Sequence, residues 1–109
     1  MNISIKKYNK DIAHNMNLGC EELITLNWIE TAFKYRHPQK FQIKNENFFE
    51  IKYSSLLKEL PILKISKQTL SKRIIKNLVN ANVLKREIIQ GSFGTLSVFN
   101  FGKCYKLLN

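Results

Sequence analysis

Residues 66–80 read SKQTLSKRIIKNLVN, and this stretch decides the fold that we expect. On a helical wheel at about 100° per residue, the apolar side chains fall on one side: Leu70, Ile74, Ile75, Leu78 and Val79. Ser66 is a favoured N-cap residue, so the pattern predicts a helix from Lys67 to about Asn80, closed by Ala81-Asn82. The other side of this helix carries cationic and amide side chains.

That outer face contains no carboxylate, because no residue from Lys67 to Asn80 is Asp or Glu. A solvated helix face usually pairs Glu with Lys at a spacing of four residues, since such pairs stabilise the helix. The excess of basic over acidic residues extends beyond this helix. Residues 51–86 hold nine Lys or Arg against Glu59 alone, which gives +8 of the net charge of +10. A charge concentrated in this way favours a polyanionic partner over an ordinary solvated surface.

The flanking sequence predicts further elements on both sides of this helix. Before it we expect a strand at 2–8, helices at 10–17 and 20–35, and strands at 41–43 and 48–51 around a turn at 45–47. A helix at 55–60 follows, with Ser54 as its N-cap and Pro61 as its stop, and a connection at 62–65 leads to Ser66. After it, runs at 83–90 and 95–101 around the glycine-flanked turn 91–94 predict a hairpin.

The order helix, strand, helix, helix, hairpin is that of the winged-helix plan, in which the two middle helices form a helix-turn-helix. We therefore expect an α+β fold, a winged helix-turn-helix of three to four helices with a C-terminal β-hairpin wing. A length of 109 residues suits one domain. We assign a single winged-helix domain to 1–109, with an N-terminal extension at 1–17, the helix-turn-helix at 54–80 and the wing hairpin at 83–101.

The second helix of a helix-turn-helix reaches base edges in the major groove with its N-terminal turns. Gln suits adenine, Arg suits guanine, and Thr can meet a thymine methyl group. The candidate base-reading residues are therefore Gln68, Thr69, Lys72 and Arg73. The candidate phosphate contacts are Lys52, Lys58, Lys64, Ser66, Lys67, Lys76, Asn77, Lys85 and Arg86. The wing tip Ser92-Phe93 carries no cation, so we expect the helix to supply most of the specificity.

The residues that catalysis or metal binding would need are scattered. Asp11 is the only aspartate, and His14 and His37 show no zinc-ligand spacing with each other or with Cys20. No glycine-rich phosphate loop is present. We expect a protein that is not an enzyme and that needs no cofactor and no metal. Cys20 and Cys104 are expected to be free, partly buried thiols, and the aromatic residues to pack in the core rather than stack on bases.

Neither an apolar run of membrane-spanning length nor the apolar core of a signal peptide occurs in the sequence. We therefore expect a cytoplasmic protein without a membrane partner.

Three stretches resemble the winged-helix domains of phage and plasmid replication proteins. LGCEELITL at 18–26, followed by Trp28, is similar to their opening helix, and YSSLLKELPIL at 53–63 is similar to their first motif helix. ISKQTL at 65–70, with the apolar positions up to Val83-Leu84, resembles their recognition helix and first wing strand. The resemblance covers about residues 18–108, and transcription regulators share the same pattern.

The resemblance implies a double-stranded DNA-binding protein of a mobile element, a phage or plasmid, that acts in replication initiation or transcriptional regulation. The expected partner is double-stranded DNA. A homodimer is expected if the target is palindromic, with residues 2–17 at the contact, and a replication or regulatory protein is a further candidate partner. The alternative is a winged-helix adaptor whose basic face docks on an acidic protein.

Overall fold

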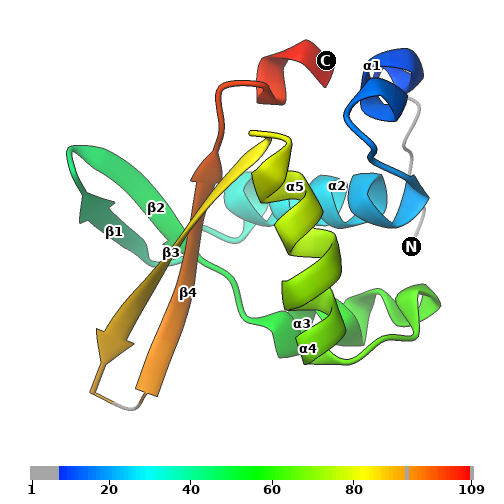
Figure 1. The fold of residues 1–109 in the computed structure, drawn as a ribbon. Coiled ribbons are helices and arrows are strands. Elements are labelled where there is room, and N and C mark those ends of the chain that lie inside the picture. The colour runs from blue at the N-terminus through cyan, green and yellow to red at the C-terminus, as the bar shows by residue number, and fades with distance from the viewer. Residues whose placement is uncertain (1–7, 93, 109) are drawn as a thin grey trace.

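The computed structural model describes residues 8–92 and 94–108 and shows a mixed α+β fold (Figure 1). The elements in chain order are α1 (Lys10–Asn15), α2 (Cys20–Tyr35), β1 (Lys40–Ile43), β2 (Glu46–Glu50), α3 (Tyr53–Glu59), a 3₁₀ turn (Pro61–Leu63), α4 (Lys67–Thr69), a π-helical segment (Leu70–Ile75), α5 (Lys76–Asn80), β3 (Leu84–Gly91), β4 (Gly94–Phe101) and a 3₁₀ turn (Tyr105–Leu108). The coil from α4 through α5 is continuous, and we name it helix 67–80 (Figure 1). None of the helices in the described ranges has the length and apolar content needed to cross a membrane.

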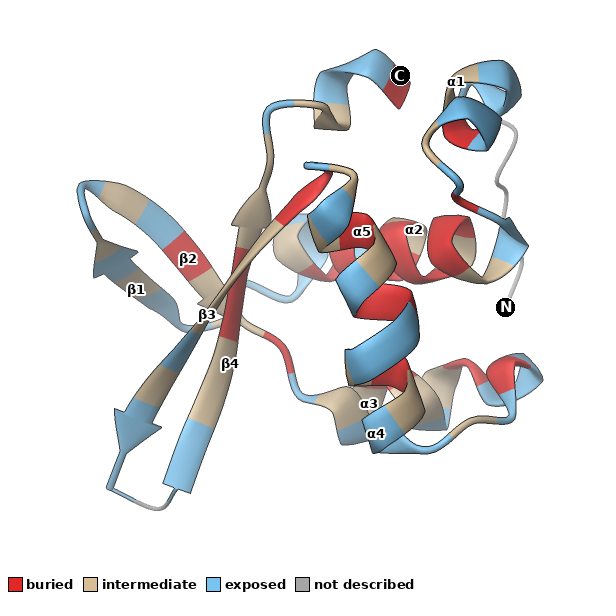
Figure 2. Ribbon diagram, viewed as in Figure 1, coloured by how far each residue is buried: buried red, intermediate tan, exposed pale blue. Residues whose placement is uncertain are grey.

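The four strands form one antiparallel sheet in the order β1-β2-β4-β3. The β3–β4 hairpin is paired from Leu84↔Phe101 to Gly91↔Gly94, so each strand reaches one residue further into the turn than the sequence predicts. The sheet stands beside α2 and helix 67–80 (Figure 1). Buried residues line the facing sides of these helices and the middle of β4, which is where the core lies (Figure 2).

Helix 67–80 begins and ends where the sequence predicts. The Ser66 hydroxyl accepts a hydrogen bond from the backbone N–H of Thr69 at 3.1 Å, as an N-cap does. The predicted apolar side is inside: Leu70, Ile74, Ile75 and Leu78 are fully buried. Asn82 ends the helix in the left-handed region, with φ of 60°. The π-helical segment is not predicted by the apolar pattern, which fits either kind of helix over so short a span.

The hairpin of β1 and β2 has a different turn from the expected one at 45–47. Ile43 pairs with Glu46, so the turn consists of Lys44 and Asn45 alone. Both residues have positive φ, 51° and 66°. A two-residue turn with positive φ at both positions matches the right-handed twist of the strands. This match outweighs the energetic cost of placing Lys44 in the left-handed region.

The start of α3 also differs from expectation. Ser54 is not the N-cap: it lies inside the helix, and Lys52 occupies the cap position without a side-chain hydrogen bond. The helix ends at Glu59, ahead of Pro61, which opens the 3₁₀ turn. Lys64 then adopts the left-handed region, with φ of 50°, which redirects the chain toward Ser66.

The N-terminal part of the described chain packs against its C-terminal turn. Asn9 caps α1, and its backbone N–H donates to the carbonyl of Leu108 at 2.7 Å. Asn17, within the predicted helix 10–17, adopts positive φ beyond the end of α1. The strand expected at 2–8 falls, except for Tyr8, outside the described residues. Tyr8 is buried and donates to Glu30 at 2.9 Å, and burial together with this carboxylate raises the pKa of its hydroxyl.

Helix α2 runs over the predicted range, and the Glu22 carboxylate accepts from the Gly19 N–H at 2.7 Å at its start. Cys20 and Cys104 are both free, as expected, but Cys20 is exposed rather than partly buried because it occupies the outer side of the first turn of α2.

Glu59 joins α3 to α2, and the pH dependence of stability provides a test of its contacts. Its carboxylate accepts from the guanidinium of Arg36 and from Trp28 Nε1 at 3.2 Å, and the Arg36 hydrogen bond lowers the pKa of the carboxyl. A lowered pKa stabilises the fold above the unfolded-state value of about 4.3, and this stability is lost as pH falls through the folded-state pKa. We therefore expect the free energy of unfolding of the Glu59→Gln variant to fall less than that of the wild type between neutral pH and about pH 3.

Urea denaturation at a series of pH values measures this difference. The control is the same pair of proteins in an Arg36→Met background. Because that background lacks the cation that lowers the carboxyl pKa, Glu59→Gln should there change the pH dependence of stability much less. Parallel loss of stability on acidification in the wild type and in Glu59→Gln would contradict the assignment.

Candidate nucleic-acid interface

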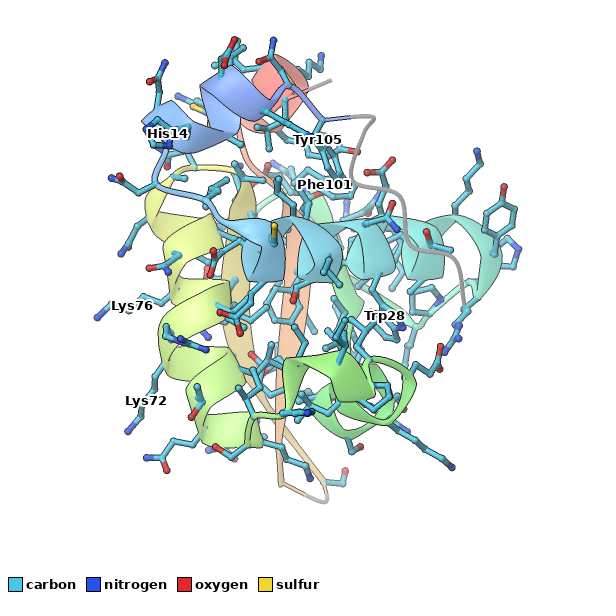
Figure 3. All side chains as sticks on the ribbon, turned by 90° about the vertical axis from the view of Figure 1, so that its right-hand side faces the viewer. His14, Trp28, Lys72, Lys76, Phe101 and Tyr105 are labelled. Carbon is cyan, nitrogen blue, oxygen red and sulfur yellow. The ribbon has the colours of Figure 1, made fainter. Side chains whose placement is uncertain are left out.

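The outer side of helix 67–80 presents one row of exposed polar side chains at a spacing of four residues. This row consists of Gln68, Lys72, Lys76 and Asn80, all of them exposed. Lys72 and Lys76 project from the same side of the helix, away from the body of the protein (Figure 3). Neither lysine has a hydrogen-bond or ion-pair partner among the described residues, so both ammonium groups are available to a ligand. Asn80 was not among the predicted site residues, although its four-residue spacing from Lys76 marks it.

The start of helix 67–80 adds two exposed lysines and a serine hydroxyl that is already hydrogen-bonded within the protein. Lys64 and Lys67 are exposed on either side of Ser66. The Ser66 hydroxyl donates to Thr69 Oγ1 at 3.1 Å while it caps the helix, so the two predicted contact residues bond to each other. Ser66 therefore has a structural task, whatever else it contacts.

Replacement of Ser66 by alanine separates these tasks. We expect the free energy of unfolding of Ser66→Ala to fall by about 1 kcal/mol, because an N-cap is lost. Urea denaturation measures the loss, and Ser66→Asn, which keeps a capping side chain, should restore most of it. Unchanged stability with weakened DNA binding would instead identify Ser66 as a phosphate ligand.

A second row on helix 67–80 turns toward α2. Arg73 Nη2 donates to Glu21 Oε2 at 3.2 Å, and Asn77 Nδ2 donates to Glu22 Oε2 at 3.5 Å. Arg73 is half exposed, whereas Asn77 is partly buried. Of the site residues predicted on the helix, Gln68, Lys72 and Lys76 therefore lie in the exposed row, whereas Arg73 and Asn77 contact carboxylates of α2.

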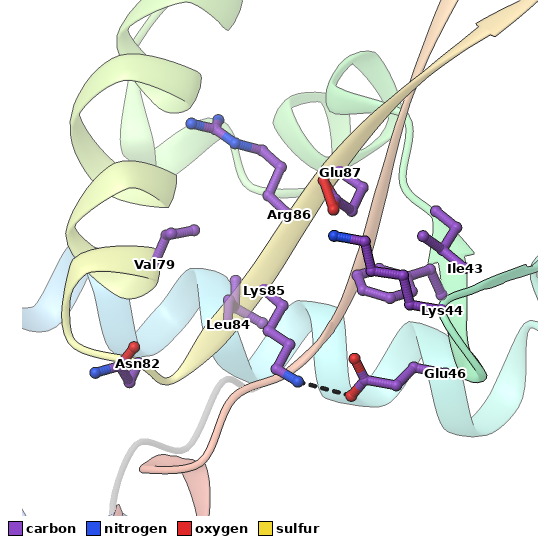
Figure 4. A pocket seen from close by; sticks show the side chains of 10 residues that line it. Ile43, Lys44, Glu46, Val79, Asn82, Leu84, Lys85, Arg86 and Glu87 are labelled. Carbon is purple, nitrogen blue, oxygen red and sulfur yellow. Dashed lines mark hydrogen bonds and ion pairs between the residues drawn. The ribbon is translucent and has the colours of Figure 1, made fainter.

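Arg86 is on β3 and is not part of the exposed row. Its guanidinium reaches from β3 toward helix 67–80 (Figure 4), where Nη1 donates to the carbonyl of Ser71 at 3.1 Å and to its hydroxyl at 3.0 Å. Tyr53 Oη lies 3.5 Å away as a third acceptor. Ser71 belongs to the π-helical segment, so Arg86 fastens the wing strand to that part of the helix. Nη1 of Arg86 therefore has a structural role, and the phosphate contact predicted for this residue stays a prediction.

Lys85 lies on the other side of β3, over a groove between the β1–β2 hairpin and the end of helix 67–80. Its Nζ donates to Glu46 Oε1 at 2.6 Å (Figure 4). The groove holds about 330 Å³ and its lining includes Lys44 and Glu87, so both signs of charge are present. Lys85 is thus paired with a carboxylate, unlike Lys72 and Lys76.

The two remaining lysines lie on α3. Lys58 is exposed in its last turn, and Lys52 is exposed at its N-cap position. Lys52 borders a hollow of about 240 Å³ together with Lys67 and Thr95, so it lies beside the start of helix 67–80 and the wing. The sequence does not indicate this proximity, because Lys52, Lys67 and Thr95 are far apart in the chain. Of the wing tip, Ser92 is exposed and Phe93 lies outside the described residues.

Within residues 8–92 and 94–108, no group of three His, Cys, Asp or Glu side chains is close enough to hold a metal ion. Comparison of the chain with protein-family models, curated proteins and solved structures finds no match in any of the three.

Proposed function

We propose that this chain is a winged-helix protein that binds double-stranded DNA with helix 67–80 in the major groove. The observation that carries the proposal is the exposed row of Gln68, Lys72, Lys76 and Asn80, which has free cations and no carboxylate on it. Phosphate contacts by lysine give affinity, and amide side chains can read base edges. Lys64 and Lys67 extend the same positive surface at the start of the helix.

The arrangement of elements supports the winged-helix part of the proposal. The chain runs from α2 through β2 to α3, helix 67–80 and the β3–β4 hairpin, which is the order of that plan. β4 of the β3–β4 hairpin pairs with β2, the strand that precedes α3. The hairpin and this strand therefore belong to one sheet. The β1–β2 hairpin is an addition to the plan. The resemblance of residues 18–108 to phage and plasmid replication proteins favours a role in replication initiation or transcriptional control of a mobile element.

The test is the binding of the whole chain to a labelled duplex of mixed sequence at a series of salt concentrations. Neutralisation of three or four phosphates gives a slope of log K against log salt of about −3. We expect a slope of at least this size and weaker binding to a single strand of the same sequence. Absence of binding at low salt, or binding that salt does not weaken, would overturn the proposal.

A further inference from the structure

The first turn of α2 places two consecutive carboxylates against helix 67–80. Glu21 meets Arg73 at 3.2 Å and Glu22 meets Asn77 at 3.5 Å, although the partners are more than fifty residues apart in the chain. The carboxylates therefore border the row of cations on which the proposed function rests. An acidic group beside a phosphate-binding surface lowers the affinity of that surface for phosphate, so each carboxylate calls for a further role.

The two carboxylates have different surroundings. Glu22 is buried, with 7% of its surface exposed, and its other oxygen accepts from the Gly19 N–H at 2.7 Å. Its task is to close the start of α2 and to hold Asn77. Glu21 is different, because its side chain is 43% exposed and its ion-pair partner is 51% exposed. The helix dipole favours a carboxylate in the first turn of α2, but an ion pair with this exposure contributes little to stability, so folding does not explain the contact of Glu21 with Arg73.

The contact leaves Arg73 able to exchange partners. A single guanidinium nitrogen, Nη2, meets a single carboxylate oxygen. Arg73 follows Lys72 in the chain and lies one helical turn before Lys76, so a duplex that contacts both lysines comes within reach of its side chain. A phosphate that approaches Arg73 also approaches the Glu21 carboxylate, and the two negative charges repel each other. A guanine edge can bond the remaining guanidinium nitrogens with less repulsion, since its acceptors are uncharged.

We propose that Glu21 is a specificity-determining residue: it withholds Arg73 from phosphate and so weakens binding to DNA of arbitrary sequence. This inference rests on the proposed function and adds a residue to it that the basic row alone does not indicate. Discrimination by a repulsive group is a general way of reducing the affinity for wrong targets. Glu21 acts through Arg73, so its effect depends on that side chain.

The experiment is a double-mutant cycle on the same mixed-sequence duplex with the whole chain. We expect Glu21→Gln to bind about two- to fivefold more tightly than the wild type, as the loss of an exposed ion pair allows. The slope of log K against log salt should steepen by about 0.9, one additional phosphate. In the Arg73→Ala background the same substitution should change neither quantity by more than the experimental error.

Asp11→Asn is the matched control, because it removes one negative charge from the exposed first turn of α1. Equal affinity of Glu21→Gln and wild type would overturn the inference, as would an equal gain in the Arg73→Ala background or in Asp11→Asn. Thermal melting of each variant shows whether the fold is intact. Failure of the wild type itself to bind overturns the proposed function, so the two failures are distinguishable.

Discussion

We expect the Lys72→Ala/Lys76→Ala variant to bind duplex DNA about 100-fold more weakly than the wild type, because two charge-assisted contacts are lost at about 1.5 kcal/mol each. Loss of two phosphate contacts should also reduce the salt slope by about 1.8. Both lysines are exposed, and alanine is the best helix former. The free energy of unfolding should therefore stay unchanged or rise slightly.

Lys34→Ala/Lys40→Ala is the matched control for this experiment. These two lysines are exposed on α2 and β1, outside the basic segment, and their removal lowers the net charge equally. We expect this pair to change affinity only a few-fold. An equal loss in both variants would show that overall charge, and not the row on helix 67–80, accounts for binding.

The second large effect is expected on stability, at Gly102. A Cβ at this position would lie 2.2 Å from the carbonyl oxygen of Asn82 and 2.6 Å from its carbonyl carbon. The two backbone segments are fixed there, because the Gly102 N–H donates to Val83 and the Cys104 N–H donates to Asn82, both at 2.8 Å. The clash is with backbone, so no side-chain movement can relieve it. We expect Gly102→Ala to lose about 3 kcal/mol or more of unfolding free energy.

Gly19→Ala is the comparison, since a Cβ there would meet only the carboxylate end of Glu22, at 3.3 Å. We expect this change to cost about 1 kcal/mol or less, the range of N-cap substitutions. Urea denaturation of both variants measures the difference. A Gly102→Ala protein as stable as Gly19→Ala would mean that the segment after β4 moves freely against Asn82.

The helices and the faces of helix 67–80 were predictable because burial repeats along one element. Leu70, Ile74 and Leu78 are spaced for one buried side, and the exposed row follows from the same periodicity. The turn at Lys44-Asn45 and the N-cap of α3 were not predictable in this way. The backbone there follows the twist of a strand pair and the path from β2, which outweigh the preference of Ser54 for a cap.

The residue types of the candidate site were predictable from the sequence, but the residues that they contact were not. Sequence composition shows that Arg73, Lys85 and Arg86 are cations, but not that Glu21, Glu46 and Ser71 lie against them. These contacts join residues that are far apart in the chain, and only the packing of α2 and of the sheet on helix 67–80 brings them together. Lys72 and Lys76 have no partner among the described residues, and the helical wheel already places them on the outer face.

The hydrogen bonds of Arg86 have a consequence for the entropy of association. Because this guanidinium joins β3 to Ser71, the hairpin and helix 67–80 keep one relative orientation before any partner arrives. Ordering a mobile side chain on binding costs about 0.5–1.5 kcal/mol, and a hinged hairpin would add the ordering of its backbone. In this protein that ordering takes place during folding. A ligand that contacts the helix therefore meets a hairpin already in position, as in rigid-body docking.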